Sequence, residues 1–252
     1  MKIGMAQINS IIGDFDGNFN IIQNYIEKAR SAAVDLLIFP ELAVSGYPPQ
    51  DLIFRDDFIG RNQKYLDKIT AKIPAEMLCI IGFVDKNEGR YFNSAALIQN
   101  QKVIAVRQKT LLPNYDVFDE KRYFTPANSQ DPVTVRFNGE KLTLGIEICE
   151  DLWDEDSPVK VTQNLVEKGA EIIVNISASP FEKGKRETRN RLVLDKVTKL
   201  GVPFVLVNYC GAQDEIIFAG NSIACDKQGN IIALGDEFQE GFYNSVLSPA
   251  IK

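Results

Sequence analysis

Short apolar runs alternate along the chain with longer stretches of helical periodicity. The runs at 35–40 and 202–207 are apolar at nearly every position, which is typical of strands buried on both faces. The apolar runs predict strands at residues 2–9, 35–41, 77–85, 93–99, 102–109, 133–137, 141–149, 171–177, 202–209, 221–226, 230–236 and 242–248.

Amphipathic stretches predict helices at residues 18–33, 57–72, 158–168 and 186–200. The third has Ser157 as a capping residue, Pro158 in its first position and Gly169 just past its end. The fourth ends at Gly201, which Pro203 follows. Helices between single strands indicate βαβ units, and these require a sheet that is at least partly parallel.

Three turn signals indicate hairpins within the same sheets. The strongest is Asn138-Gly139, and the segments "QNQK" and "DKQGN" are two more. Hairpins together with βαβ units predict an α/β fold with mixed sheets, in which helices cover one face of the buried strands and a second sheet covers the other. No repeat, low-complexity segment or linker interrupts the pattern, so residues 1–252 are predicted to form a single domain.

Composition excludes several classes of partner. The formal net charge is −6 at pH 7, which argues against nucleic acid and against anionic membrane surfaces, because both require clustered lysine and arginine. No apolar run approaches the ~20 residues of a membrane span, and the first residues lack the apolar core of a signal peptide. The four cysteines form no CxxC pair, and we therefore expect a reduced, cytoplasmic protein.

The chain contains no histidine. Catalysis by Ser-His-Asp or Cys-His is therefore impossible, and a Cys/His zinc site is excluded as well. Any hydrolytic chemistry must use Glu, Asp, Lys, Tyr, Cys or a bound metal.

Three reactive residues stand in equivalent places, each at the end of a predicted strand. They are Glu41 after "LLIFP", Lys109 after "VIAVRQ" and Cys149 after "LTLGIEI". The carboxyl edge of an α/β sheet is where sites gather. Composition alone nevertheless favours an inert interpretation: a solvated carboxylate, an exposed lysine and a small core cysteine.

The contexts of these residues change the interpretation. The segments "IFPELAVSGYPPQDL" (38–52), "RQKTLLPNYDVFDEKRYF" (107–124), "GIEICEDLW" (145–153) and "NISASPFEKGKRETR" (175–189) occur in this order. They resemble the signature segments of the nitrilase superfamily of carbon–nitrogen hydrolases, and most of all its branch that forms the glutaminase domain of glutamine-dependent NAD synthetases. The resemblance runs from Met1 to about Ser248.

The resemblance implies an α-β-β-α four-layer sandwich with two mixed sheets and a role for each matched residue. Cys149 is the nucleophile, Glu41 the general base and Lys109 the oxyanion partner. Glu120 matches a second carboxylate that helps to hold the lysine and the substrate. Tyr115, Ser179 and Lys185 match glutamine-binding positions, and Tyr47, Glu150 and Trp153 are expected to line the same pocket.

Acidic residues surround Cys149, and carboxylates disfavour a thiolate. We expect Lys109 to offset them, because a lysine–thiolate attraction at about 4 Å is on the order of 4 kcal/mol at an effective dielectric near 20. Glu41 would take the thiol proton during attack. For a glutamine substrate, Glu150 would accept from the α-ammonium, and Lys185 with Ser179 would donate to the α-carboxylate.

The predicted function is hydrolysis of the glutamine side-chain amide to supply ammonia for NAD synthesis, without a cofactor. The family carries its ATP-using synthetase domain after this one, and no pyrophosphate loop of the Ser-Gly-Gly type occurs before Lys252. The chain is thus either one half of such an enzyme, with the synthetase as partner and an apolar or weakly charged patch near its C-terminus, or a free-standing ω-amidase or N-carbamoyl amidase. A homo-oligomer is expected.

Two readings of another kind stay open. One is a non-catalytic scaffold on the same fold, against which the intact Glu41, Lys109 and Cys149 argue. The other is a carboxylate-bound Mg²⁺ site in "EDLWDED", for which a solvated acidic loop is the better explanation.

Overall fold

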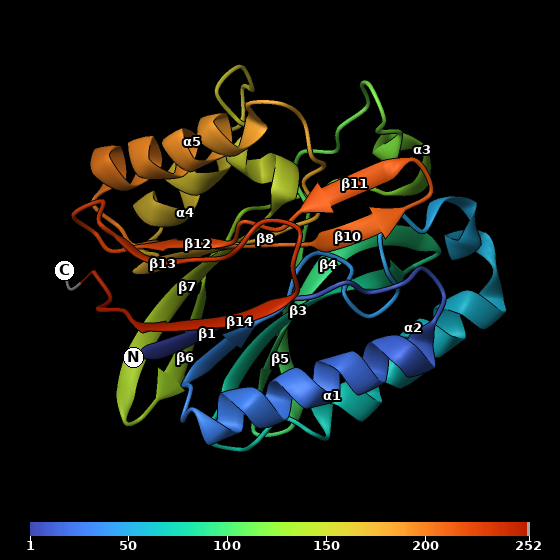
Figure 1. The fold of residues 1–252 in the computed structure, drawn as a ribbon, viewed down its shortest axis with the longest axis horizontal. Coiled ribbons are helices and arrows are strands. Elements are labelled where there is room, and N and C mark those ends of the chain that lie inside the picture. Colours follow the sequence, from blue (N-terminus) through green and yellow to red (C-terminus); the bar gives the residue numbers. More distant parts are fainter. Residues whose placement is uncertain (251–252) are drawn as a thin grey trace.

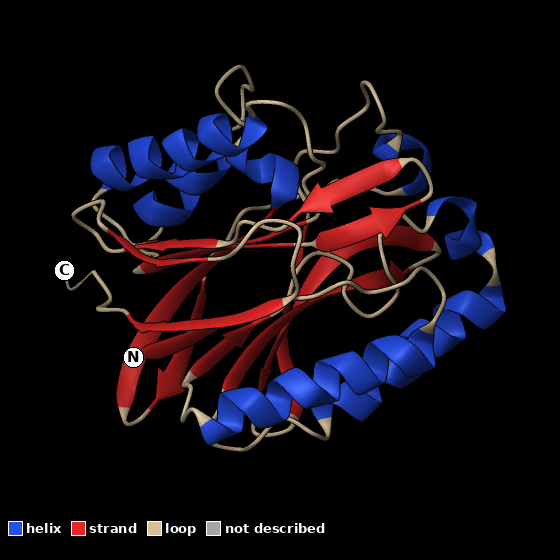
Figure 2. Ribbon diagram, in the orientation of Figure 1, coloured by secondary structure: helices blue, strands red, loops and turns tan. Residues whose placement is uncertain are grey.

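The computed structural model describes residues 1–250, and these form two six-stranded mixed sheets that pack face to face (Figures 1 and 2). The first sheet has the order β14-β1-β2-β3-β4-β5. Its strands are β1 (Lys2–Gln7), β2 (Leu36–Ile38), β3 (Leu78–Asn87), β4 (Arg90–Gln99), β5 (Lys102–Gln108) and β14 (Gly241–Val246). The strands β1, β2 and β3 are parallel, and the others pair antiparallel.

The second sheet has the order β13-β12-β9-β8-β7-β6. Its strands are β6 (Val133–Phe137), β7 (Glu140–Ile148), β8 (Ile172–Ser177), β9 (Phe204–Asn208), β12 (Ile223–Cys225) and β13 (Ile231–Leu234). Here β7, β8 and β9 are parallel. A separate two-stranded ribbon consists of β10 (Cys210–Gln213) and β11 (Ile216–Ala219).

Helices cover the outer face of each sheet (Figure 1). The helices α1 (Phe15–Ser31) and α2 (Asp56–Thr70) lie on the first sheet, and α4 (Val161–Glu167) and α5 (Lys185–Leu200) lie on the second. The short helices are η1 (Gln50–Phe54), α3 (Glu120–Tyr123) and η2 (Cys149–Leu152). None of the helices within residues 1–250 is long and apolar enough to cross a bilayer.

Three apolar layers hold these elements together, as the four-layer α-β-β-α arrangement requires. One lies between the sheets and includes Met5, Ile146 and Val174. The second lies between the first sheet and α1 with α2, and the third between the second sheet and α4 with α5. The predicted α-β-β-α sandwich with two mixed sheets is therefore confirmed.

The hairpin predictions are confirmed as well. Asn138 and Gly139 adopt φ values of 50° and 84° between β6 and β7, as a tight two-residue turn needs. The third predicted helix begins later than expected, at Val161 instead of Pro158. The reason is a turn before it, in which Ser157 Oγ accepts from Val159 N and Lys160 Nζ donates to the carbonyls of Asp154 and Glu155.

Candidate active site

The three strand-end residues meet where the two sheets face each other. Glu41 follows β2 and Lys109 follows β5 in the first sheet, while Cys149 follows β7 in the second. Gly82 on β3 allows the loop of Glu41 to pack closely, because a Cβ there would lie 2.2 Å from Leu42 N. The fold thus brings together Glu41 and Lys109, which are 68 positions apart in the sequence, with Cys149 from the other sheet.

Lys109 lies between two carboxylates in the protein interior. Its Nζ is 2.8 Å from Oε1 of Glu41 and 2.9 Å from Oε1 of Glu120, and its side chain is fully buried. Burial lowers the pKa of Lys109, but the two carboxylates more than offset this and raise it well above its ordinary value. Lys109 is therefore a permanent cation with one of its three N–H donors left over.

Glu41 accepts three hydrogen bonds. Asn93 Nδ2 donates to Oε1 at 2.6 Å, in addition to Lys109, and the Ala178 N–H donates to Oε2 at 2.7 Å. This arrangement orients a carboxylate and leaves it able to accept a proton from a neighbour. Asn93 was not predicted from the sequence. The available signal is its place, with Ser94, as a buried polar pair in the middle of β4.

Cys149 adopts a left-handed backbone conformation with φ of 45°, rare for a residue with a Cβ. Burial raises the pKa of its thiol well above the ordinary value; Glu41 raises it further, and Lys109 lowers it. Lys109 thus acts on the thiol pKa in the expected direction, but burial and Glu41 outweigh it. We therefore expect Cys149 to lose its proton during the attack.

Asp151 connects the segment around Cys149 to the segment that follows Lys109. Its Oδ1 accepts from the backbone N–H groups of Thr110 and Leu111 at 3.0 and 2.7 Å, and its Oδ2 accepts from Ile148 N at 3.0 Å. Two other acids of "EDLWDED" have partners of their own: Glu150 accepts from Tyr115 and Asp154 pairs with Lys196. No group of three or more Asp, Glu or Cys side chains in residues 1–250 is arranged to hold a metal ion.

A cavity of about 380 Å³ opens onto Cys149. It is lined by Tyr115, Phe118, Cys149, Glu150, Trp153, Ser179, Glu182, Lys183, Gly184, Lys185 and Thr188. Five of the six expected pocket residues therefore lie together. The sixth, Tyr47, lies behind the site and donates its hydroxyl to Glu120 Oε1 at 2.8 Å.

The polar groups of this cavity are free to meet a ligand. Ser179 is buried, and its Oγ has no hydrogen-bond partner among residues 1–250. Lys185 lies 5.9 Å from the ring centres of both Phe118 and Trp153, and its only ion-pair partner among residues 1–250 is Glu182 at 4.0 Å. A carboxylate entering the cavity would satisfy both groups.

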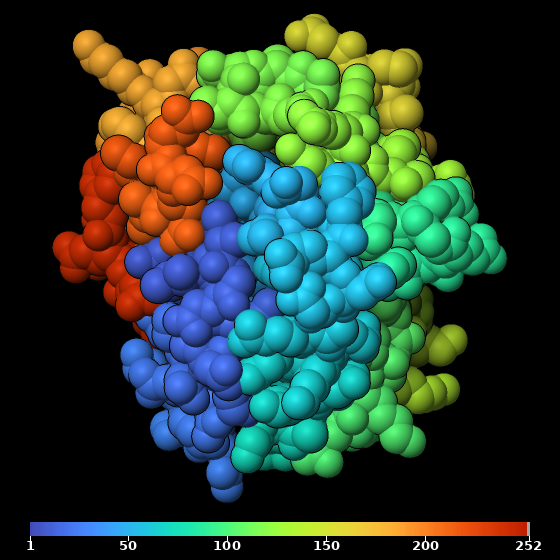
Figure 3. Space-filling view, turned by 90° about the vertical axis from the view of Figure 1, so that its right-hand side faces the viewer, coloured from blue at the N-terminus to red at the C-terminus, as the bar shows by residue number. Residues whose placement is uncertain are grey.

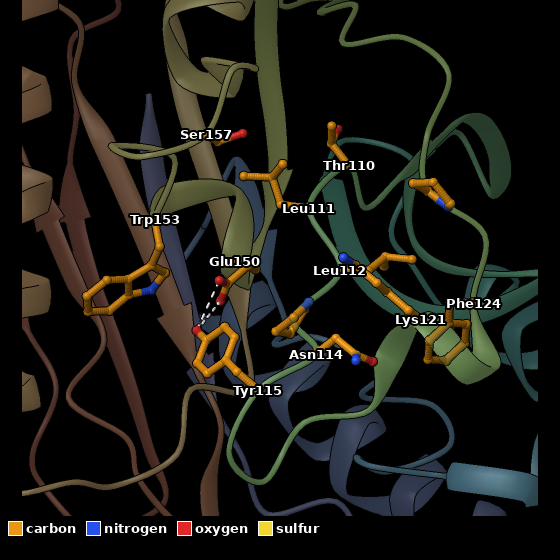
Figure 4. A pocket seen from close by; sticks show the side chains of 12 residues that line it. Thr110, Leu111, Leu112, Asn114, Tyr115, Lys121, Phe124, Glu150, Trp153 and Ser157 are labelled. Atoms are coloured by element: carbon orange, nitrogen blue, oxygen red, sulfur yellow. Dashed lines mark hydrogen bonds between the residues drawn. The ribbon is translucent and has the colours of Figure 1, made fainter.

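A second cavity of about 650 Å³ shares three of these residues (Figure 4). Tyr115 donates its hydroxyl to Glu150 at 3.0 Å from either carboxylate oxygen, and Trp153 lies beside them. The remaining wall comes from the segment after Lys109, including Leu111, Leu112 and Phe124, and from Ser157.

Three segments enclose Glu120 and Tyr47 on the other side of the site. The η1 segment in light blue, the green segment around α3 and the orange β10–β11 ribbon lie against one another on the face in Figure 3. The sequence did not predict this ribbon. Burial, partly offset by Lys109, raises the pKa of Glu120 to about 7.

The raised pKa of Glu120 predicts a pH dependence of stability. Folded Glu120 holds its proton more tightly than the unfolded side chain, so its contribution is complete below the unfolded pKa of 4.5 and is lost as the pH rises to about 7. Between pH 5 and 8, the free energy of unfolding of Glu120→Gln should therefore fall less than that of the unsubstituted chain, by up to about 3 kcal/mol. Urea unfolding at several pH values measures this, and parallel curves would refute it.

Comparison with known proteins places this geometry in a family. The family model described as carbon-nitrogen hydrolase matches residues 2–252. A glutamine-dependent NAD(+) synthetase from Thermotoga maritima is 37% identical over 95% of this chain and 41% of its own length. One from Synechocystis sp. is 34% identical over 94% of this chain and 44% of its own. The chain thus spans about two fifths of the length of these relatives.

Solved structures agree with this placement. A glutamine-dependent NAD+ synthetase from Acinetobacter baumannii, in complex with ADP, matches with a TM-score of 0.86 and 33% identity over 96% of this chain and 44% of its own. A carbon-nitrogen hydrolase from Helicobacter pylori G27 has the same fold, with a TM-score of 0.83 at 20% identity over 98% of this chain and 88% of its own. The chain belongs to the carbon-nitrogen hydrolase family.

Proposed function

We propose that this chain hydrolyses the side-chain amide of glutamine to glutamate and ammonia through a thioester on Cys149. The observation that carries the proposal is the cavity in which Cys149 lies together with a free Ser179 hydroxyl, the Lys185 ammonium and the Glu150 carboxylate. A cation and an anion at one cavity match the two charged groups of an α-amino acid. The relatives named for glutamine support the same substrate.

In the proposed first half-reaction, Sγ of Cys149 attacks the amide carbon while Glu41 takes the thiol proton. Proton transfer accompanies the attack in this proposal because the raised pKa of Cys149 disfavours a thiolate before the substrate reacts. The carbonyl oxygen becomes an oxyanion. Two N–H groups of Lys109 donate to Glu41 and Glu120, and the third N–H donates to the oxyanion and stabilises it. Glu41 then passes its proton to the leaving nitrogen, the C–N bond breaks, and ammonia departs.

In the second half-reaction, a water molecule attacks the thioester carbon. Glu41, ionised again, accepts a proton from this water, and the C–S bond breaks to release glutamate. The proton returns from Glu41 to the sulfur of Cys149. The proposal therefore needs no cofactor, and Glu41 acts as base and acid in both halves.

Glu120 and Tyr47 are assigned a supporting role. The Tyr47 hydroxyl and Lys109 both donate to the same oxygen of Glu120, so this carboxylate fixes where Nζ of Lys109 lies. Tyr115 is assigned to hold Glu150, whose carboxylate it contacts at 3.0 Å. Trp153 would give Lys185 an aromatic wall, which favours a fixed position for the ammonium.

The proposed use of the ammonia is NAD synthesis by an ATP-dependent synthetase domain or subunit. Three large apolar side chains, Ile231, Leu234 and Val246, are exposed on β13 and β14, at the end of the molecule where the described chain ends (Figure 1). Both strands lie at the edge of their sheets. We assign this patch to contact with the synthetase. The free thiol of Cys149 requires a reducing compartment, and we place the reaction in the cytoplasm.

Lys185→Ala tests the substrate. If Lys185 binds the α-carboxylate, its loss should raise KM for glutamine by about 10²-fold, the cost of a charge-assisted hydrogen bond of some 3 kcal/mol. KM for a neutral amide such as propionamide should change little. Ammonia release from each amide by the unsubstituted chain and by Lys185→Ala, with and without a synthetase domain, measures this.

Lys183→Ala is the matched control, since Lys183 lines the same cavity and is exposed. It should leave both KM values close to those of the unsubstituted chain. Equal effects of Lys185→Ala on KM for glutamine and for propionamide would mean that Lys185 does not bind the α-carboxylate. Turnover of other ω-amides or N-carbamoyl compounds without glutamine turnover would replace the proposal by a free-standing amidase.

A further inference from the structure

A second carboxylate is buried directly behind the nucleophile. Glu147 lies on β7, two residues before Cys149, and is 1% exposed. It belongs to the layer between the second sheet and α4. Gly145, on the same face of β7, would place a Cβ against Ile173 and Leu165, which shows how apolar this layer is. Burial raises the pKa of Glu147.

Neutral donors hold this carboxylate. Asn175 Nδ2 donates to Oε1 of Glu147 at 3.0 Å, and Thr162 Oγ1 donates to Oε2 at 2.9 Å. The neighbouring lysine, Lys196, is paired with Asp154 at 2.6 Å instead. A buried carboxylate with only neutral partners is costly to keep, and none of the catalytic steps above uses it.

The amide of Asn175 connects Glu147 to Cys149. Its Oδ1 accepts from Ser177 Oγ at 2.6 Å, and its Nδ2 lies 3.5 Å from the carbonyl oxygen of Cys149 as well as against Glu147. If the amide turned over, Oδ1 would face both a carboxylate and a carbonyl oxygen. The negative charge of Glu147 therefore determines which end of Asn175 faces the nucleophile.

The backbone at Cys149 needs such support, because a left-handed residue with a Cβ persists only where its surroundings hold it. Asp151 holds the preceding residue through Ile148 N at 3.0 Å. Asn175 is the side chain that meets the carbonyl on the following side.

We propose that Glu147 is a positioning residue: its buried carboxylate holds Nδ2 of Asn175 against the Cys149 carbonyl and so fixes the conformation that presents the thiol to the cavity. The inference rests on the proposed function, in that it assigns Glu147 a part in the same reaction. Glu147 itself touches neither the substrate nor the reacting atoms.

Glu147→Gln tests this. The glutamine can offer its own NH₂ to Asn175, so the amide is no longer held in one orientation. We expect kcat for glutamine to fall by about 10²-fold, as for a small misplacement of a reacting group, with KM nearly unchanged. Thr162→Val removes the other hydrogen bond to the same carboxylate and leaves Asn175 in place; it should lower the melting temperature but retain kcat.

A double variant separates positioning from packing. In Glu147→Gln with Asn175→Asp, the pair can hydrogen-bond again and the one buried charge is kept, but no donor faces the Cys149 carbonyl. We expect the melting temperature to recover toward that of the unsubstituted chain while kcat stays low. Recovery of kcat in this variant, or full kcat in folded Glu147→Gln, would overturn the inference.

Alkylation of Cys149 by iodoacetamide keeps the test independent of the substrate. The rate of modification, followed by mass spectrometry of the peptide, should fall in Glu147→Gln and in the double variant by a factor similar to that in kcat. If the unsubstituted chain releases no ammonia from glutamine, the proposed function fails, while the alkylation rates still decide on Glu147. Equal alkylation rates in all variants would refute the positioning role.

Discussion

Replacing Cys149 by alanine is expected to reduce ammonia release from glutamine on the order of 10⁴-fold or more, because the substitution removes the atom that forms the thioester. Glu41 and Lys109 remain at 2.8 Å from each other, so the polar site itself stays intact. The melting temperature should change by only a few degrees, since alanine bears the same left-handed backbone strain as cysteine. Steady-state ammonia release and a thermal melt measure both effects.

Cys225→Ala is the matched control for this substitution. Cys225 is also a buried free cysteine, but it lies on β12 in the layer under α5. This variant should lose some stability through the small cavity it creates and retain its kcat. Activity in Cys149→Ala above a few per cent, or loss of activity in Cys225→Ala, would contradict the assignment of Cys149 as nucleophile.

Lys109→Ala is expected to damage both activity and stability. Its removal leaves Glu41 and Glu120 facing each other in the interior without a cation, and breaking a buried pair in this way costs about 3–5 kcal/mol. The oxyanion also loses its cationic donor, for which a loss of about 10²–10³-fold in kcat is typical. Urea unfolding gives the first quantity, and ammonia release by the folded fraction gives the second.

The Glu120 carboxylate should respond to the same substitution. Without Lys109, the pKa of Glu120 should rise, so Lys109→Ala should regain stability as the pH is lowered. Lys168→Ala removes an ion pair of similar length, 2.7 Å to Asp131, but this pair is half exposed to solvent, so its loss should cost much less stability. Similar losses of stability in Lys109→Ala and Lys168→Ala would show that Glu41 and Glu120 do not depend on Lys109 for charge compensation.

The sequence predicted most of the strands and the place of the site. Each strand-end residue was recognisable because a predicted strand ends at Glu41, Lys109 or Cys149, and such ends gather at one edge of a sheet. The ribbon β10–β11 was missed, because its strands are short and Ile217 is exposed, so neither shows a clear apolar run.

The electrostatic balance of the site could not be predicted in the same way. It depends on how deeply Glu120 of α3 is buried beside Lys109, with which it pairs at 2.9 Å. The roles of Asn93 and Asp151 are also set by contacts across the fold, and neither stands in a local pattern that indicates them. Sequence spacing therefore indicated which groups meet, while the protonation state of Cys149 required their three-dimensional arrangement.

The central claim is that glutamine is cleaved through a thioester on Cys149. The most direct measurement is mass spectrometry of the chain after acid quenching during turnover of glutamine, followed by digestion and assignment of the modified peptide. The account predicts one glutamyl group on the peptide that contains Cys149, absent from Cys149→Ala and lost when glutamine is exhausted. Glutamate formed without any adduct on this peptide, an adduct on another cysteine, or no adduct at saturating glutamine would contradict it.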